Sequence, residues 1–216
     1  MERLRRVPQG WWKTYSSPRA LEQARRALTA WRHPRMPRVL EQDGTRLLLS
    51  HLEGRPSADW AAAGAWRRGF AQVQDQDPMP LHVALQKRLE SWSTALAAFE
   101  AVDAWGLQGD HTGLARVRCH RDFQPRNWVM GAQGFGVLDF EHAAPDHPLT
   151  DAVKVLDHIA PDSDAFHAFM GRTLSDAEGA QLRDLRLIHG LASRAWGHRH
   201  EDPEFLDLGQ RVLAGL

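Results

Sequence analysis

Three polar residues between positions 120 and 140 have the types and the spacing that phosphoryl transfer requires. Asp122 and Asn127 lie five positions apart in a segment that Pro125 stiffens, and Asp139 follows twelve positions after Asn127. A carboxylate and an amide oxygen are hard ligands that suit Mg²⁺ shared with substrate phosphates. Asp122 then remains free to accept a proton from an attacking hydroxyl. The pattern therefore predicts a metal site, a base and a positioning group in one place.

Short apolar runs must position these residues. Ala115–Cys119 and Gly136–Phe140 are predicted strands, and each delivers polar groups at or after its carboxyl end. A third strand, Asn127–Met130, and a turn at 131–134 complete a hairpin with the second run. Because a hairpin of this length brings its two ends together, we expect Asp139 to face the residue that begins the hairpin.

These segments resemble those of a known family. His120-Arg-Asp-Phe-Gln-Pro-Arg-Asn127 resembles the HxDxxxxN catalytic loop of the aminoglycoside phosphotransferase and choline kinase family, whose fold is similar to that of protein kinases. Leu138–Glu141 resembles the D-F-G segment of that fold, with Glu in place of Gly, and Asp146–Asp151 resembles the family's D-x-P-x-x-D segment. The three matches occur in the family's order and at its separations.

The resemblance implies an α+β, protein-kinase-like fold of two lobes, with a small N-terminal β lobe and a larger, mainly helical C-terminal lobe. It implies ATP and Mg²⁺ as cofactors and a small-molecule hydroxyl as phosphate acceptor. In this reading Asp122 is the catalytic base, Asn127 and Asp139 hold the metal, and His120 supports the loop. Asp151, near a predicted helix start, is expected to be structural, as a cap or a partner of the helix dipole.

Residues 1–49 form the predicted N-terminal lobe of a strand, a helix and a hairpin. Lys13 lies in the strand, Ser17 is placed to cap the helix, and Asp43-Gly44 is a hairpin turn. The resemblance implies that Lys13 touches nucleotide phosphates and that Glu22 pairs with it. From the residues alone, Glu22 could equally favour the first helical turn electrostatically.

The hinge is predicted at residues 50–56, where the resemblance implies that His51 and Leu52 meet the adenine edge. Only twelve residues precede Lys13, too few for two strands and the glycine-bearing loop that covers the phosphates in such kinases, so the lobe is expected to lack the first hairpin. The alternatives are a minimal enzyme, a misassigned start codon, or lost nucleotide binding. The presence of Asp122, Asn127 and Asp139 together favours an active enzyme.

Residues 57–216 are predicted to be the helical lobe, from apolar spacing and from caps such as the Ser175–Glu178 capping box. The predicted helices span residues 59–74, 81–105, 150–159, 165–171, 175–196 and 204–216. A polar break is expected at 197–203. His198 and His200 lie in it and lack spaced partners, so we predict a solvated loop there rather than a metal site.

Composition excludes several classes of protein. The 27 basic and 27 acidic residues give no basic field that would suggest a nucleic-acid partner. No apolar run approaches a membrane span, and the first ten residues are too polar for a signal peptide. The single cysteine, Cys119, fits a reducing, cytoplasmic location. A Cys119–His120 nucleophile pair is disfavoured because neighbours on a strand point to opposite faces.

Two further function classes remain open from the sequence. The first is a non-catalytic kinase-like binding protein that lacks the phosphate-covering loop. The second is a metal-dependent hydrolase that uses His120, Asp122 and Asp139. It would need further histidine ligands, and His142 and His147 are only loosely placed for that role.

The acceptor and the oligomeric state are also open. Aminoglycosides, choline-like alcohols, amino acids and sugars all remain candidates for the acceptor. Glu141, Asp146, Asp162 and Asp164 could attract a cationic acceptor, although ordinary solvated charges are the favoured interpretation.

Overall fold

A four-stranded antiparallel sheet forms the N-terminal lobe of the computed structural model, which describes residues 4–74, 77–158 and 163–216. The strands are β1 (Leu4–Val7), β2 (Gly10–Thr14), β3 (Val39–Asp43) and β4 (Arg46–Ser50), in the order β1-β2-β4-β3. Gly44 has φ +54° in the β3–β4 turn, a conformation that glycine adopts without strain. The predicted Asp43-Gly44 hairpin is therefore confirmed.

The sheet contains one strand that the sequence did not predict. Residues of β1 pair antiparallel with β2, so that Leu4 lies opposite Lys13 and Val7 opposite Gly10. Strand β1 contains two arginines and an exposed Leu4, so its sequence shows no alternation of apolar and polar residues. An edge strand such as β1 buries little of either face. One strand thus precedes the lysine strand in the described part of the chain.

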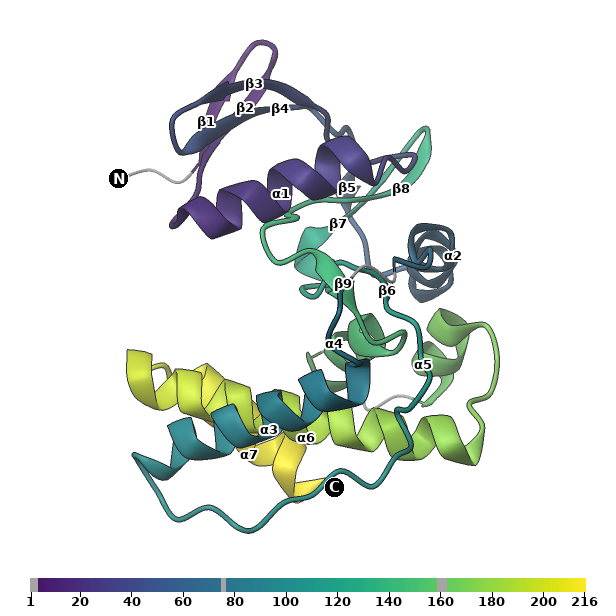
Figure 1. The fold of residues 1–216 in the computed structure, drawn as a ribbon. Coiled ribbons are helices and arrows are strands. Elements are labelled where there is room, and N and C mark those ends of the chain that lie inside the picture. Colours follow the sequence, from purple (N-terminus) through teal and green to yellow (C-terminus); the bar gives the residue numbers. More distant parts are fainter. Residues whose placement is uncertain (1–3, 75–76, 159–162) are drawn as a thin grey trace.

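Helix α1 (Pro18–Ala30) covers one face of this sheet (Figure 1). It begins as predicted, because Ser17 Oγ accepts a hydrogen bond from the Ala20 amide at 3.1 Å and Pro18 occupies the first turn. Leu21 and Ala24 on its buried side pack with Leu47 of β4 in a small core. The helix is thereby fixed against the strand that carries Lys13.

Two small sheets join the lobes. Strand β5 (Arg55–Pro56), which follows the hinge, pairs with β7 (Trp128–Gly131), and β7 pairs with β8 (Gly134–Val137) in the predicted hairpin. Strand β6 (Val117–Cys119) pairs with β9 (Ala144–Asp146). The hinge is therefore hydrogen-bonded to the same hairpin that positions the catalytic segment.

Six helices make up the C-terminal lobe in the described residues, and the long α6 packs against α3 and α7 at its base (Figure 1). Their bounds are α2 Trp60–Phe70, α3 Leu81–Ala97, α4 Thr150–His158, α5 Ser163–Met170, α6 Asp176–His200 and α7 Pro203–Ala214. The core contains the fully buried Phe70, Phe123, Trp128 and Leu187. The predicted Ser175–Glu178 capping box is present at the start of α6.

Several helix ends differ from the prediction. Helix α2 stops at Phe70 rather than at residue 74, because the following backbone pairs with the β6 strand: the Arg118 amide donates to the Gln72 carbonyl at 3.0 Å. The expected break at 197–203 is wrong in its first half, since α6 continues to His200 and ends at Glu201 in a left-handed conformation. Ile159 and Asp162 lie outside the described residues.

The two late histidines consequently lie on a helix. His198 Nε2 is 3.2 Å from the Glu100 carboxylate, and the His200 ring packs on Trp196 with centroids 3.8 Å apart. In the described segments, no group of three His, Cys, Asp or Glu residues is arranged to hold a metal ion. The described helices also include none that is both long and apolar enough to cross a membrane.

Candidate active site

Asp122 lies at the centre of a tight loop between β6 and β7. The chain turns through Arg121, at φ +66°, and then forms a short 3₁₀ helix over Pro125–Asn127. The Asn127 side-chain nitrogen donates to the Asp122 carbonyl at 2.8 Å and to its carboxylate at 2.9 Å. The predicted proximity of Asp122 and Asn127 is therefore present. Both hydrogen bonds use the amide nitrogen, which leaves the Asn127 oxygen for a cation.

Positive groups surround the Asp122 carboxylate. Gln124 donates a hydrogen bond to it, and the Arg126 guanidinium lies 3.1 Å away. Burial tends to raise the pKa of Asp122, but Lys154 and Arg126 outweigh burial and lower that pKa to about 2. Asp122 is therefore ionised throughout the neutral range and accepts hydrogen bonds from donors that approach it.

His120 and Asp151 support this loop from beneath. The Asp151 carboxylate accepts hydrogen bonds from the backbone amides of His120 at 3.0 Å and Arg121 at 2.8 Å, which ties α4 to the loop. His120 is fully buried, its Nε2 lies 2.7 Å from the Leu138 carbonyl, and its Nδ1 accepts from the Asp122 amide at 3.3 Å. The side chains of both residues thus hydrogen-bond to backbone groups, as residues that support the loop must do.

The hairpin brings Asp139 next to this loop. The Leu138 amide donates to the Asn127 carbonyl at 2.8 Å, which extends the β7–β8 pairing to the residue just before Asp139. Asp139 has φ +63°, an unfavourable conformation for a residue with a side chain. Such conformations persist where the surrounding structure holds them, often at functional sites. The backbone hydrogen bond between Leu138 and Asn127 therefore supports the expected proximity of Asn127 and Asp139 at the base of the hairpin.

Lys13 crosses from the N-terminal lobe to this segment. Its ammonium forms an ion pair with Asp139 and a second one with the buried Glu141 Oε2, at 3.2 Å. Burial, Asp139 and Glu141 together raise the pKa of the neighbouring Tyr15 hydroxyl. Two carboxylates therefore converge on one cation at the junction of the lobes.

The predicted pair between Lys13 and Glu22 does not form. Glu22 lies on the exposed face of α1, and its carboxylate binds Arg25 at 2.7 Å one turn along the same helix. Leu21 and Ala24 take the buried positions of α1, so the register of the helix turns Glu22 toward solvent. The partner of Lys13 is instead the segment 139–141.

A cavity of about 530 Å³ opens beside Asp122 between the lobes. The start of α1 lines it from above, with Ser17 and Gln23, and Trp92, Lys154 and Trp196 line it from the helical lobe. The predicted adenine-binding residues His51 and Leu52 line a different cavity, of about 430 Å³, beside the hinge. The structure thus separates the cavity beside Asp122 from the cavity beside the predicted hinge.

Sequence reasoning missed three residues of this site. Arg126 and Gln124 lie inside the quoted loop, but nothing in their spacing showed that both contact Asp122. Lys154 follows Asp151 by three positions, so one helical turn brings it to the same face of α4, and this periodicity could have revealed it.

Comparisons with known proteins agree with this geometry. A family model described as "Phosphotransferase enzyme family" matches residues 4–187, and the chain belongs to that family. Among curated proteins, no sequence matches significantly.

Solved structures share the fold at low sequence identity. The GDP complex of aminoglycoside 2'-phosphotransferase-IIIa superposes with a TM-score of 0.67 at 14% identity, over 99% of this chain and 91% of that one. Choline kinase LicA from Streptococcus pneumoniae gives 0.61 at 13%, over 98% and 88%. Macrolide 2'-phosphotransferase MphH from Brachybacterium faecium gives 0.64 at 14%, over 94% and 84%. The expected kinase-like α+β fold is confirmed.

Proposed function

We propose that this member of the phosphotransferase enzyme family transfers the γ-phosphoryl group of ATP to a hydroxyl of a small molecule. The observation that carries the proposal is the ionised Asp122 at the wall of a cavity, with Asn127 and Asp139 beside it at the base of one hairpin. That arrangement offers an acceptor for the hydroxyl proton and two oxygen donors within one loop cluster.

The residues present fit Mg²⁺ and a nucleotide. Asn127 keeps its amide oxygen unused by hydrogen bonds in the described part of the chain, and Asp139 with Glu141 already holds a cation, the Lys13 ammonium. Asn127 and Asp139 would hold the metal, and Lys13 would turn to the phosphates. Bound Mg²⁺ supplies charge neutralisation between the β- and γ-phosphates.

The role of Asp122 follows from its surroundings. A carboxylate with a pKa of about 2 is a weak base, so its main contribution is to orient the acceptor hydroxyl by accepting its hydrogen bond. The proton passes to Asp122 late, as the bond to the phosphoryl group forms. A loose transition state asks little more of the protein than such positioning and charge.

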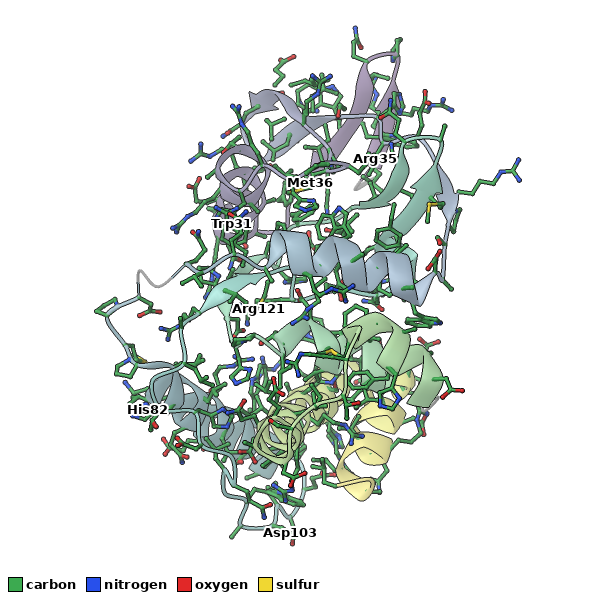
Figure 2. All side chains as sticks on the ribbon, turned by 90° about the vertical axis from the view of Figure 1, so that its right-hand side faces the viewer. Trp31, Arg35, Met36, His82, Asp103 and Arg121 are labelled. Atoms are coloured by element: carbon green, nitrogen blue, oxygen red, sulfur yellow. The ribbon has the colours of Figure 1, made fainter. Side chains whose placement is uncertain are left out.

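The test is Asp122→Asn, assayed with radiolabelled ATP and a panel of hydroxyl compounds. We expect loss of transfer by a factor of about 10² to 10⁴, because the asparagine amide can still accept a hydrogen bond but carries no charge and cannot take the proton of the hydroxyl, while the fold is kept. Asp103→Asn is the matched control, since Asp103 is exposed on a loop of the helical lobe (Figure 2). Transfer at the normal rate by the Asp122 variant would contradict the assignment.

Thermal shift with ATP and Mg²⁺ separates the enzyme from a non-catalytic kinase-like protein. A ligand that binds the folded state raises apparent stability, so we expect a higher Tm for the wild type and for Asp122→Asn alike. Absence of any shift would favour the non-catalytic alternative. The hydrolase alternative gains nothing from the described residues, which include no cluster of three metal-ligating side chains of the His, Cys, Asp or Glu type.

A further inference from the structure

The cavity beside Asp122, here called the outer cavity, adjoins a second, smaller one. This inner cavity, of about 180 Å³, shares Trp92, Arg121 and Lys154 with the outer one, so the two lie on either side of the same side chains. Helices α3, α4 and α6 and the catalytic loop form its walls, and no residue of the N-terminal lobe or the hinge lines it. A group bound there belongs to the acceptor and not to the nucleotide.

The walls of the inner cavity carry basic side chains. Arg88, Arg121, Lys154 and His189 line it, and no Asp or Glu among the described residues does. Figure 2 shows Arg121 at the junction of the two lobes. Carboxylates offset part of this charge: Arg88 and Arg121 share the buried Asp146, at 3.0 and 3.2 Å. Asp157 lies 3.1 Å from His189 and also binds Arg186, and both Asp157 and Asp122 attract Lys154.

Positive charge also predominates among the side chains that line the outer cavity. Arg19, Arg126 and Lys154 line it with two carboxylates, Asp122 and Glu141. Glu141 is paired with Lys13, and Asp122 is paired with Arg126. A polycationic acceptor would therefore meet guanidinium and ammonium groups here, and bringing like charges together costs free energy.

Apolar side chains line part of both cavities. Val153, Leu185 and Ile188 face the inner cavity, and Trp196, which is 45% exposed, stands at the outer one. An exposed tryptophan beside a cavity commonly marks a binding surface. Aromatic rings can also attract cations. The charged side chains beside these rings are themselves cationic, however, and these side chains favour an anion.

We propose that the acceptor is an anionic hydroxyl compound, a hydroxy acid with an apolar or planar body, whose carboxylate enters the inner cavity toward Arg88, Arg121 and Lys154. Its hydroxyl then reaches Asp122 in the outer cavity, and its body lies along Trp92. This inference rests on the proposed phosphoryl transfer and names the substrate class of the same site.

The test compares three benzyl alcohols whose substituent at the 4-position is anionic, neutral or cationic. They are 4-(hydroxymethyl)benzoate, the neutral 4-(hydroxymethyl)benzamide and the cationic 4-(aminomethyl)benzyl alcohol, each assayed for phosphorylation with ATP and Mg²⁺ and for binding by calorimetry without nucleotide. We expect kcat/KM for the benzoate to exceed that for the benzamide by about tenfold or more, the gain typical of one charge-assisted contact, and the amine to be poorest.

Lys154→Gln locates the effect. We expect it to raise KM for the benzoate by a larger factor than KM for the benzamide, and Lys154→Arg to restore the preference for the benzoate. A loss of kcat that both acceptors share would reflect the effect of Lys154 on Asp122. A merely structural role of Lys154 would raise both KM values together. Lys87→Gln is the control, because Lys87 is an exposed residue of α3 that lines neither cavity.

The outcomes separate the inference from the proposed function. Equal or better use of the amine or the benzamide overturns the anionic acceptor and leaves phosphoryl transfer standing. Benzoate binding that depends on Lys154, without phosphorylation, supports the anion site and counts against phosphoryl transfer. Failure of the benzoate to bind more tightly than the amine overturns the inference.

Discussion

His147 illustrates how one buried residue makes the fold sensitive to pH. It follows Asp146 in β9, is 1% exposed, and its Nδ1 accepts a hydrogen bond from the Leu149 amide at 3.0 Å. Its Nε2 is buried and has no hydrogen-bond partner among the residues that the structure describes. Burial and the nearby His111 lower the pKa of His147 to about 4, so the folded protein holds this ring neutral.

Stability should therefore fall as the pH drops from about 6.5 toward 4. In that window the unfolded chain binds a proton at His147 that the folded chain does not, and the free energy of unfolding falls by about 1.4 kcal/mol per pH unit for this residue. His147→Asn keeps an acceptor for the Leu149 amide and cannot titrate, so we expect a shallower slope of unfolding free energy against pH in urea titrations.

The control is His82→Asn, because His82 is exposed on α3 (Figure 2) and should leave the slope unchanged. Comparing slopes rather than absolute stabilities separates titration from any packing defect of the variant. Identical slopes for the wild type and His147→Asn would show that His147 is protonated in the folded state.

For individual residues, the sequence predicts more reliably which side chains lie close together when a single loop or hairpin joins them. Asp122 and Asn127 lie in one loop, so their spacing sufficed to bring them together. The partner of Lys13 was misassigned to Glu22, because that assignment depended on how α1 rotates against a sheet. The packing of small apolar residues such as Ala24 decides this rotation. The local periodicity of the sequence specifies the rotation to within a turn at best.

Among the helices, α2 and α5 come unusually close. A methyl group at Gly64 of α2 would lie 1.8 Å from the Phe169 carbonyl oxygen of α5. The Arg68 guanidinium of α2 donates to the carbonyls of Phe169 at 2.9 Å and Met170 at 3.1 Å, at the end of α5. Backbone contact and arginine capping together fix the two helices in one relative position.

Gly64→Ala should consequently destabilise the protein despite the higher helix propensity of alanine. Propensity favours the change by about 1 kcal/mol, but forced separation of packed backbones costs about 1–3 kcal/mol, or more where the contact is rigid. We expect a net loss of stability by thermal or urea unfolding. A gain of stability would mean that α5 moves away freely.

Gly179→Ala in α6 is the matched control. No atom lies within 4 Å of a methyl group at Gly179, and the residue is exposed. Only the higher helix propensity of alanine then affects stability, so the same substitution should stabilise the protein by up to about 1 kcal/mol. Opposite signs at the two glycines would attribute the difference to packing rather than to alanine itself.

Element ends were the least predictable part of the fold. The capping box at Ser175 was predicted because cap and partner are three residues apart. The end of α6 was not, since Gly197 remains helical where it packs closely on α7: a methyl group at Gly197 would lie 2.7 Å from the Leu206 amide nitrogen. Strand β1 was missed for a similar reason, because its charged sequence becomes a strand only by pairing with β2.

On the scale of the whole molecule, Lys13 connects the lobes electrostatically. It belongs to β2 of the N-terminal lobe, whereas Asp139 and Glu141 follow β8 beside the helical lobe. The Lys13 side chain is 10% exposed and that of Glu141 14%, so solvent screens their pair weakly. Removing the lysine leaves two carboxylates facing each other without a cation, which is the costly way to break such a cluster.

Lys13→Met should therefore lower stability by about 2 kcal/mol in metal-free buffer, with the cost moderated by the partial exposure of Asp139. Millimolar Mg²⁺ without nucleotide should then raise the Tm of Lys13→Met more than that of the wild type, because the metal replaces the missing ammonium between the carboxylates. Lys87→Met, which removes an exposed lysine of α3, should respond to Mg²⁺ as the wild type does. Equal Mg²⁺ shifts in all three proteins would show that Asp139 and Glu141 do not share a magnesium ion when the lysine is absent.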